Sequence, residues 1–330
     1  MIRIAILGAG RIGRIHATNA AANPRCRLVA VVDSVAAAAE GLARALGCEA
    51  ATDPRAVIAR GDVDAVVIGT PTDTHVDLLL EAARAGKGVL CEKPLDLDIR
   101  KVDAAIAETD RLGARTMIAF NRRFDPSAAA LRRAIDRGEI GEVRQVVITS
   151  RDPEPPPPAY IASSGGIFRD MTIHDFDMAR WLLGEEPRQV FAAAATLVDP
   201  KIGAAGDFDT VMIVLQTESG RQCHINNCRQ AAYGYDQRLE VFGAGGMLLN
   251  DNLRPSTLRH YDASKTEVRE PLLNFFLERY AEAYRFELDA FLAALERGLP
   301  MPLTLEDGRR ALRLADAALE SAASGRVVAV

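Results

Sequence analysis

The chain has 330 residues, of which 48% are hydrophobic and 26% charged, and its formal net charge is −5. This length suffices for two domains with separate cores, and the negative charge argues against nucleic acid or an anionic membrane as the main partner. The five scattered cysteines form no CxxC pair, which predicts reduced thiols in a cytoplasmic protein. No apolar run reaches the roughly 18 residues of a membrane helix, and the N-terminus does not have the pattern of a signal peptide.

The first 120 residues alternate short apolar runs with helical segments rich in Ala, Leu and Arg. The predicted strands are 2–7, 27–33, 64–70, 88–92 and 115–120. Their apolar runs are continuous rather than alternating, which indicates strands covered on both faces in a parallel sheet with crossover helices. We therefore predict an α/β domain over residues 1–120, a Rossmann-like, doubly wound parallel sheet.

The pattern changes after Phe120. A helix is predicted at about 126–137 and a strand at 142–150, followed by the proline-rich segment 152–160, which we expect to be a stiff, extended loop or simply a surface spacer. Further predicted strands are 188–198, 207–217, 221–228, 236–243 and 246–250. Residues 121–330 are thus predicted to form an α+β domain with a large open, mainly antiparallel sheet. The last helices, about 273–322, are candidates for packing back on the first domain.

Several strands of this second domain are apolar on both sides, as in VMIVLQ at 211–216. Few helices remain to cover both faces of such a sheet. We expect the uncovered face to meet another subunit, so the chain is predicted to be a homo-oligomer.

The first predicted strand leads into GAGRIG, a glycine pattern that opens a helix. In this context Gly8 makes the tight turn, Gly10 lets the backbone approach a pyrophosphate, and Gly13 allows close helix–strand packing. Asp33 ends the second strand 20 residues after Gly13 (33 − 13), where a carboxylate binds the ribose hydroxyls and repels a 2′-phosphate, so NAD is favoured over NADP. A glycine turn beside a solvated aspartate is the alternative. The expected cofactor contacts here are Gly8, Ala9, Gly10, Arg11, Ile12, Gly13 and Asp33.

Two further loops follow predicted strands at the edge where such sheets bind ligands. One is TPTDTH at 70–75, whose polar side chains could equally cap the next helix. The other is CEKPL at 91–95, where a proline after the strand end indicates a sharp turn, with a cis peptide as one option. The expected cofactor contacts in these loops are Thr70, Pro71, Thr72, His75, Glu92 and Lys93.

The segment RDMTIHDFDMARWL at 169–182 predicts a helix with Asp170, His174 and Asp177 along one side. These side chains could bind a metal, form an acid–base pair or make a solvated stripe. A metal site would need further converging ligands, and no standard zinc spacing is present. The apolar residues of the same helix indicate a buried opposite face, which disfavours a solvated stripe. We therefore favour the acid–base interpretation for Asp170 and His174, with Asp175 and Asp177 structural.

GAGRIG, EKP at 92–94 and GGIFRDMTIHDFDMARWL at 165–182 together resemble the Gfo/Idh/MocA family of NAD(P)-dependent sugar and polyol dehydrogenases. The resemblance covers essentially the whole chain. AFNRRFDPS, ITSRDPEPPPPAYI and YGYDQRLEVFG are most similar to segments of the inositol 2-dehydrogenase subgroup.

The resemblance implies oxidation of a cyclic polyol, with myo-inositol converted to 2-keto-myo-inositol as hydride passes from a ring carbon to the nicotinamide. The implied catalytic residues are Lys93, Asp170 and His174. Histidine, with a reference pKa near 6.5, is a natural base for the hydroxyl proton, and a lysine can stabilise the developing alkoxide. Asp170 can orient Lys93 or the substrate. Whether Lys93 or His174 takes the proton first stays open.

The implied substrate-binding residues are Lys93, Arg123, Asp152, Asp170, His174 and Tyr233. Arg123 could instead pair with Asp125, and Tyr233 could be an interface aromatic. Within the family, rival activities are oxidation of scyllo-inositol, an aldose or an anhydrosugar, and NAD-assisted glycoside cleavage. A non-catalytic NAD-sensing regulator is an alternative of a different class. The expected partners are a small cyclic polyol and further copies of the chain in a homotetramer.

Overall fold

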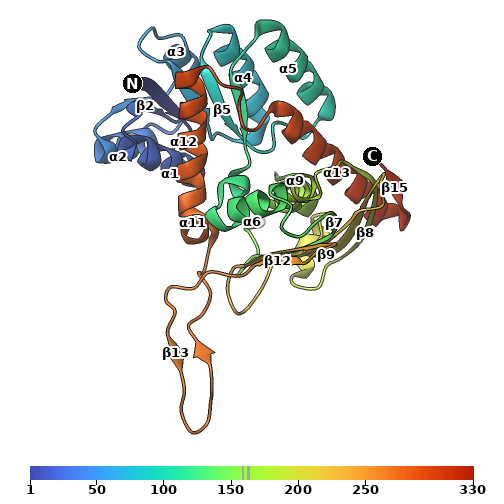
Figure 1. The fold of residues 1–330 in the computed structure, drawn as a ribbon. Coiled ribbons are helices and arrows are strands. Elements are labelled where there is room, and N and C mark those ends of the chain that lie inside the picture. The colour runs from blue at the N-terminus through green and yellow to red at the C-terminus, as the bar shows by residue number, and fades with distance from the viewer. Residues whose placement is uncertain (158–159, 162–163) are drawn as a thin grey trace. The chain divides into compact units, whose positions relative to one another are not determined.

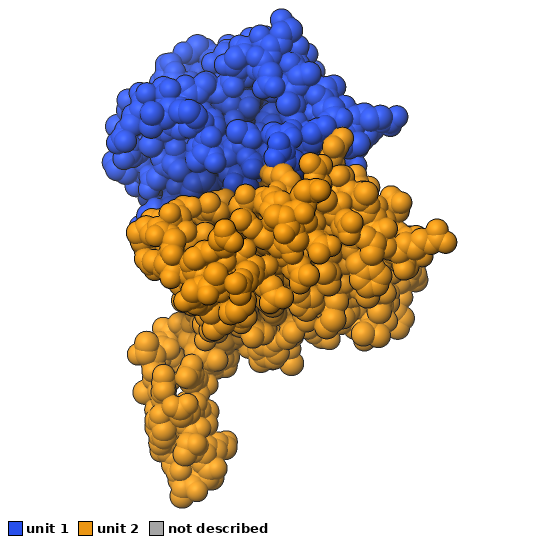
Figure 2. All heavy atoms as spheres, turned by 45° about the vertical axis from the view of Figure 1, so that its right-hand side comes forward, with its two compact units in different colours: residues 1–124, 282–312 blue, residues 125–281, 313–330 orange. Residues whose placement is uncertain are grey.

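A computed structural model describes residues 1–157, 160–161 and 164–330. The chain divides into two compact units, coloured separately in Figure 2. Unit 1 comprises residues 1–124 and 282–312, and unit 2 comprises residues 125–281 and 313–330. The helices near the C-terminus are therefore divided between the units: residues 282–312 belong to unit 1, and residues 313–330 belong to unit 2.

Unit 1 is built on a six-stranded sheet in which every pair of neighbours is parallel, in the order β3-β2-β1-β4-β5-β6. The strands are β1 (Ile2–Leu7), β2 (Cys26–Val32), β3 (Glu49–Ala51), β4 (Ala65–Ile68), β5 (Gly88–Glu92) and β6 (Thr116–Ala119). The predicted doubly wound α/β architecture is confirmed. β3 was not predicted, because three partly exposed residues at a sheet edge leave no periodic pattern.

Most helices of unit 1 lie in the connections between these parallel strands, and the last two come from the C-terminal part of the chain (Figure 1). The helices are α1 (Arg11–Ala22), α2 (Ala36–Leu46), α3 (Pro54–Ile58), η1 (Thr72–Thr74), α4 (His75–Arg84), α5 (Ile99–Leu112), η2 (Asn121–Phe124), most of α12 (Ala281–Arg297) and the start of α13 (Leu305–Ser324). The strand order reverses between β1 and β4, and such a switch point opens a ligand crevice at the carboxyl ends of the strands. The glycine turn after β1 and the loop after β4 both lie there.

Unit 2 contains a seven-stranded sheet in the order β12-β11-β7-β10-β9-β8-β15. The strands are β7 (Val143–Arg151), β8 (Pro187–Ala195), β9 (Thr210–Thr217), β10 (Gln222–Cys228), β11 (Asp236–Gly243), β12 (Met247–Asn250) and β15 (Val328–Ala329). Only the β7–β10 pair is parallel, so the predicted mainly antiparallel sheet is confirmed. The helices of unit 2 include α6 (Pro126–Asp136), α8 (Gly166–Asp170), α9 (Thr172–Leu183), α10 (Pro200–Ala204), α11 (Phe276–Arg279) and the rest of α13.

The two faces of this sheet differ in what covers them. α9 packs on β7 and β10, and in β9 the residues Val211, Ile213 and Leu215 are buried. The alternate residues Met212 and Val214 are 52% and 45% exposed. The exposed face is therefore also apolar, as the sequence predicted, and the homo-oligomer stays a prediction.

Three local features differ from the sequence prediction. The helix expected over 169–182 is divided at Met171 into α8 and α9, and the one expected over 273–297 is divided into α11 and α12. Residues 251–271 form an unpredicted hairpin arm that contains the two-residue strands β13 (Arg259–His260) and β14 (Val268–Arg269), with a loop beyond them at its tip (Figure 1). The proline-rich segment is irregular over 152–157, whereas residues 158–159 lie outside the described residues. Among the described residues, no helix has the length and apolar character to cross a bilayer.

Candidate active site

The glycine turn after β1 has the shape that a dinucleotide requires. Gly8 has φ +103°, and a Cβ added to it would lie 2.5 Å from the carbonyl oxygen of Gly69. A Cβ on Gly13 would lie 1.8 Å from the carbonyl oxygen of Gly8, so any side chain there would separate α1 from the turn. A Cβ on Gly10 would meet nothing within 4 Å, and no side chain caps the N-terminus of α1. Open space beside uncapped helix N–H groups suits a pyrophosphate.

Asp33 is held beside this turn. Its Oδ2 accepts a hydrogen bond from the backbone N–H of Ala9 at 2.8 Å, and its Oδ1 accepts one from Val35 at 2.9 Å. Each carboxylate oxygen has two lone pairs, so both can still accept a hydrogen bond from a ribose hydroxyl. The residues around the turn therefore fit an adenine dinucleotide without a 2′-phosphate.

His75 links the two other predicted cofactor loops. Its ring is 2% exposed, with Nδ1 2.8 Å from the carbonyl oxygen of Pro94 and Nε2 2.9 Å from that of Thr70. The peptide bond between Lys93 and Pro94 is cis, which is the option the sequence raised. His75 thus fixes the loops after β4 and β5 against each other. Contacts of His75, Thr70, Pro71 and Thr72 with the cofactor stay predictions.

Glu92 and Lys93 stand at the end of β5. Glu92 is buried and lies 2.8 Å from Nε2 of His16 on α1, and the edge of Tyr284 packs against the His16 ring. Glu287 on α12 is fully buried, and burial together with the charge of Glu92 raises the pKa of Glu287 well above its usual range. Lys93 is half-buried. Sequence reasoning missed His16 and Glu287, because both occupy helix positions where an apolar core residue would be expected.

Asp170 and His174 belong to unit 2, whereas Lys93 belongs to unit 1. Asp170 is the last residue of α8, and His174 lies in the first turn of α9, so the break at Met171 separates them. Both side chains are half-buried. Asp170 accepts a hydrogen bond from the hydroxyl of Tyr160 at 2.7 Å and forms an ion pair with Arg229 at 3.4 Å.

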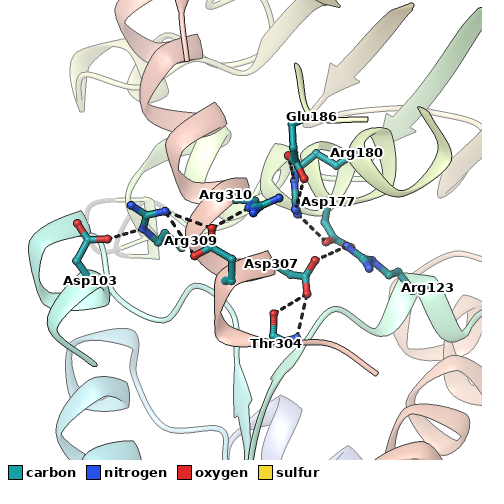
Figure 3. Close-up of polar contacts among 10 residues, drawn as sticks. Asp103, Arg123, Asp177, Arg180, Glu186, Thr304, Asp307, Arg309 and Arg310 are labelled. Atoms are coloured by element: carbon teal, nitrogen blue, oxygen red, sulfur yellow. Dashed lines mark hydrogen bonds and ion pairs between the residues drawn. The ribbon is translucent and has the colours of Figure 1, made fainter. Parts of the chain in front are cut away.

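The remaining acidic residues of this helix are not solvated. Asp175 is fully buried and accepts a hydrogen bond from the side-chain amide of Asn227 at 2.8 Å. Asp177 is 1% exposed and lies 3.7 Å from Arg180, which also binds Glu186 (Figure 3). These contacts agree with the structural role predicted for both aspartates, and they exclude a solvated acidic stripe.

The three further candidates for substrate binding have protein partners. Arg123 binds the carboxylate of Asp307 at 3.0 Å within unit 1 (Figure 3), and within unit 2 Asp125 binds Arg279. The other two contacts lie in unit 2. The backbone N–H of Asp152 donates to the carbonyl oxygen of Cys228 at 3.0 Å. The Tyr233 hydroxyl donates to Asp236 at 2.6 Å and accepts from Arg151 at 2.6 Å.

Comparison with known proteins identifies the family. Residues 2–120 match the family described as "Oxidoreductase family, NAD-binding Rossmann fold", and residues 128–249 match the "GFO/IDH/MocA C-terminal domain". The chain belongs to the Gfo/Idh/MocA family. With its NAD-binding domain and the relatives described below, this family member is an NAD-dependent oxidoreductase, and NAD is its cofactor.

Two curated relatives match this family member over nearly their full lengths. Inositol 2-dehydrogenase of Rhizobium meliloti (strain 1021) is 53% identical, over 100% of this chain and 99% of the relative. Myo-inositol 2-dehydrogenase of Thermotoga maritima is 44% identical, over 99% of this chain and 98% of the relative.

Solved structures share the fold. A putative myo-inositol dehydrogenase from Sinorhizobium meliloti 1021 superposes with a TM-score of 0.98 at 52% identity, covering 100% of both chains. A scyllo-inositol dehydrogenase from Lactobacillus casei, with bound NAD(H) and scyllo-inositol, has a TM-score of 0.92 at 30% identity and covers 100% of this chain and 99% of that chain.

Arg229 is the main residue of unit 2 that sequence reasoning missed. It follows β10 and is the largest fully buried side chain among the described residues. Its guanidinium binds Asp207 as well as Asp170. No motif marks it, since an arginine just past a strand end is usually solvent-exposed. Within the described parts of the Gfo/Idh/MocA chain, no group of three or more His, Cys, Asp or Glu side chains could hold a metal ion.

Proposed function

We propose that the chain oxidises a cyclic polyol with NAD, and that myo-inositol is converted to 2-keto-myo-inositol. The observation that carries this proposal is the full-length likeness to proteins named inositol 2-dehydrogenase and myo-inositol 2-dehydrogenase. The open glycine turn and the oriented Asp33 carboxylate support it on the cofactor side.

The reaction removes a hydride from a ring carbon and a proton from its hydroxyl group, which leaves a ketone. Bound NAD accepts the hydride. His174, half-buried at the start of α9, is proposed to take the hydroxyl proton, because a neutral imidazole is a suitable base near neutral pH. Lys93 is proposed to donate a hydrogen bond to the same oxygen and stabilise its developing negative charge.

Asp170 is proposed to keep the positively charged groups of the site in register. Both of its carboxylate oxygens already have protein partners, Tyr160 on Oδ1 and Arg229 on Oδ2, so its orientation is fixed before substrate binds. A fixed carboxylate stabilises charge without reorganising during the reaction.

Arg123, Asp152 and Tyr233 are proposed to bind ring hydroxyls. Arg123 and Tyr233 are already oriented by Asp307 and Asp236. A site built from such fixed polar groups rejects compounds without the matching hydroxyl, because its buried polar groups would then lose their partners.

We further propose a cytoplasmic homotetramer. The support is the apolar outer face of the unit 2 sheet, which includes Phe191, Met212 and Val214 at 40%, 52% and 45% exposure. Exposed apolar faces of this kind mark protein interfaces. All five cysteines are free thiols, as expected of a protein in a reducing compartment.

Scyllo-inositol is the second candidate substrate, because a Bacillus subtilis protein named scyllo-inositol 2-dehydrogenase (NAD(+)) is 36% identical. A panel of inositol isomers and aldoses with NAD or NADP, followed by the absorbance of reduced nicotinamide, separates the candidates. The proposal requires myo-inositol to give the highest kcat/KM. If another isomer or an aldose gives the highest kcat/KM, that compound replaces myo-inositol as the proposed substrate. If no polyol reduces NAD, a non-catalytic NAD-sensing regulator becomes the favoured function.

A further inference from the structure

The side chain of Arg229 lies under the short helix that ends in Asp170. It is 1% exposed, and its two terminal nitrogens point to different carboxylates. Nη1 lies 3.4 Å from Oδ2 of Asp170, and Nη2 lies 3.2 Å from Oδ2 of Asp207. The backbone N–H of Arg229 donates to the carbonyl oxygen of Asp209 at 2.8 Å, which fixes the start of the side chain.

Asp207 holds the opposite end of the same helix. Its Oδ1 accepts a hydrogen bond from the backbone N–H of Ile167 at 2.8 Å, in the first turn of α8. A Cβ added to Gly166 would lie 2.8 Å from this oxygen, so only glycine allows the approach. Asp207 therefore fastens the beginning of α8 while Arg229 contacts its last residue, and the two are joined by their own ion pair.

Burial makes this arrangement depend on all three charges. An arginine keeps its charge at any physiological pH, and an unpaired buried charge is strongly unfavourable. Arg229 is compensated by two carboxylates, of which Asp207 is buried and Asp170 is half-buried. A guanidinium fixed in this way limits the rotation of the Asp170 carboxylate.

We infer that Arg229 is a positioning residue, which holds the Asp170 carboxylate correctly oriented and is itself anchored by Asp207. This inference rests on the proposed catalytic role of Asp170. Arg229 acts only through Asp170, so its removal should have little further effect on turnover once Asp170 has been neutralised.

A double-mutant cycle tests this dependence. Arg229→Ala, Asp170→Asn and the double variant are compared with the unaltered chain for kcat with myo-inositol and NAD, for NADH affinity by fluorescence and for the midpoint of thermal unfolding. We expect Arg229→Ala to lower kcat roughly tenfold or more, the scale of coupling between contacting residues. In the Asp170→Asn background the same change should alter kcat less than about twofold. NADH affinity should stay within about twofold throughout.

Arg279→Ala is the matched control, because Arg279 is another buried arginine of unit 2, 5% exposed and paired with Asp125. Arg279→Ala should lower the midpoint of thermal unfolding but should not lower kcat as Arg229→Ala does. Guanidinium chloride at millimolar concentration should raise kcat of Arg229→Ala and leave that of Arg279→Ala unchanged. If Arg229→Ala does not fold, Arg229→Lys takes its place in the cycle, since the ammonium keeps the charge but cannot bridge both carboxylates in the same geometry.

The outcomes separate this inference from the proposed function. If Asp170→Asn lowers kcat and the change at Arg229 lowers it by the same factor in both backgrounds, the inference is overturned while the proposed function stands. If Asp170→Asn leaves kcat unchanged, the role of Asp170 fails, and the inference fails with it. If the unaltered chain gives no turnover with myo-inositol, the proposed substrate is wrong. The link between Arg229 and Asp170 is then tested by the unfolding midpoints of the same four proteins. If the losses in midpoint of the two single variants simply add in the double variant, the link is overturned.

Discussion

The carboxylate of Asp33 accepts a hydrogen bond from the backbone N–H of Ala9 at 2.8 Å, which ties the end of β2 to the glycine turn after β1. Its second oxygen binds the backbone N–H of Val35. The negative charge is thereby fixed where the adenosine ribose of a dinucleotide lies in this fold.

This relationship predicts the response of cofactor choice to substitution. Asp33→Ser should lower kcat/KM with NAD and raise it with NADP, because it removes the ribose acceptor and the repulsion of a 2′-phosphate. The ratio of the two kcat/KM values should change by roughly tenfold or more, the worth of one hydrogen bond to a charged group. Asp53→Asn, which changes an aspartate that caps α3 in the same unit, is the control. Equal use of both cofactors by the unaltered chain would contradict the account.

The buried carboxyl of Glu287 leads to a prediction of how the free energy of unfolding depends on pH. The pKa of its buried carboxyl is raised well above 4.5 by burial and by Glu92, with His16 as the other titratable neighbour of Glu92. Between its unfolded and folded pKa values the folded chain holds a proton that the unfolded chain has lost. The contribution of Glu287 to stability is therefore fully present below the unfolded pKa and is lost as pH rises through the raised pKa, at up to about 1.4 kcal/mol per pH unit.

Glu287→Gln removes this titration. The free energy of unfolding of the variant, measured in urea between about pH 5 and pH 8, should therefore rise relative to that of the unaltered chain as pH increases. Parallel curves for the two proteins would show that Glu287 does not hold a proton in the folded state.

The exposed sheet face of unit 2 predicts the assembly. Sedimentation at micromolar concentration should give a tetramer, and Met212→Glu should produce smaller species, because it places a charge in an apolar interface. Leu299→Glu, at a comparably exposed apolar position of unit 1, should leave the assembly unchanged. A monomer for the unaltered chain would refute the proposed interface.

The sequence predicted the fold best where a periodic pattern coincided with a motif. β5 has the predicted bounds, 88–92, because a continuous apolar run there ends at EKP. The break at Met171 was not predicted, because its backbone stays in the right-handed helical region and no glycine or proline marks the break. The arm at 251–271 is polar and short of regular structure, so no period marks it.

The site was predictable only at residues that belong to motifs. The structure gives Gly8 the tight turn and Gly13 the close packing that the spacing implied, whereas the cofactor contacts of these residues and of Asp33 stay predictions. Arg229 and Glu287 were missed for a physical reason. Each is a charged residue type in a buried position, and burial of such a residue depends on partners that are distant in sequence.

The roles proposed for His174 and Lys93 predict how kcat changes when either side chain is removed. His174→Ala and Lys93→Ala should each lower kcat by roughly 100-fold or more, the usual scale for an acid–base group. Turnover of the unaltered chain should rise with pH, since only neutral imidazole accepts a proton. NAD affinity should survive His174→Ala, and Asp177→Asn, on the same helix but with its carboxylate turned to Arg180, is the control for helix damage. If Asp177→Asn abolished turnover and His174→Ala left kcat unchanged, the role proposed for His174 would be wrong.

The most direct test of the central claim is the reduction of NAD by myo-inositol after exhaustive chelation and dialysis, followed by absorbance of the reduced nicotinamide. The account predicts that the rate persists in the chelated protein, because the proposed proton transfer uses His174 and Lys93, held in register by Asp170, rather than a metal-bound group. Loss of the reaction on chelation with recovery on added zinc would contradict it.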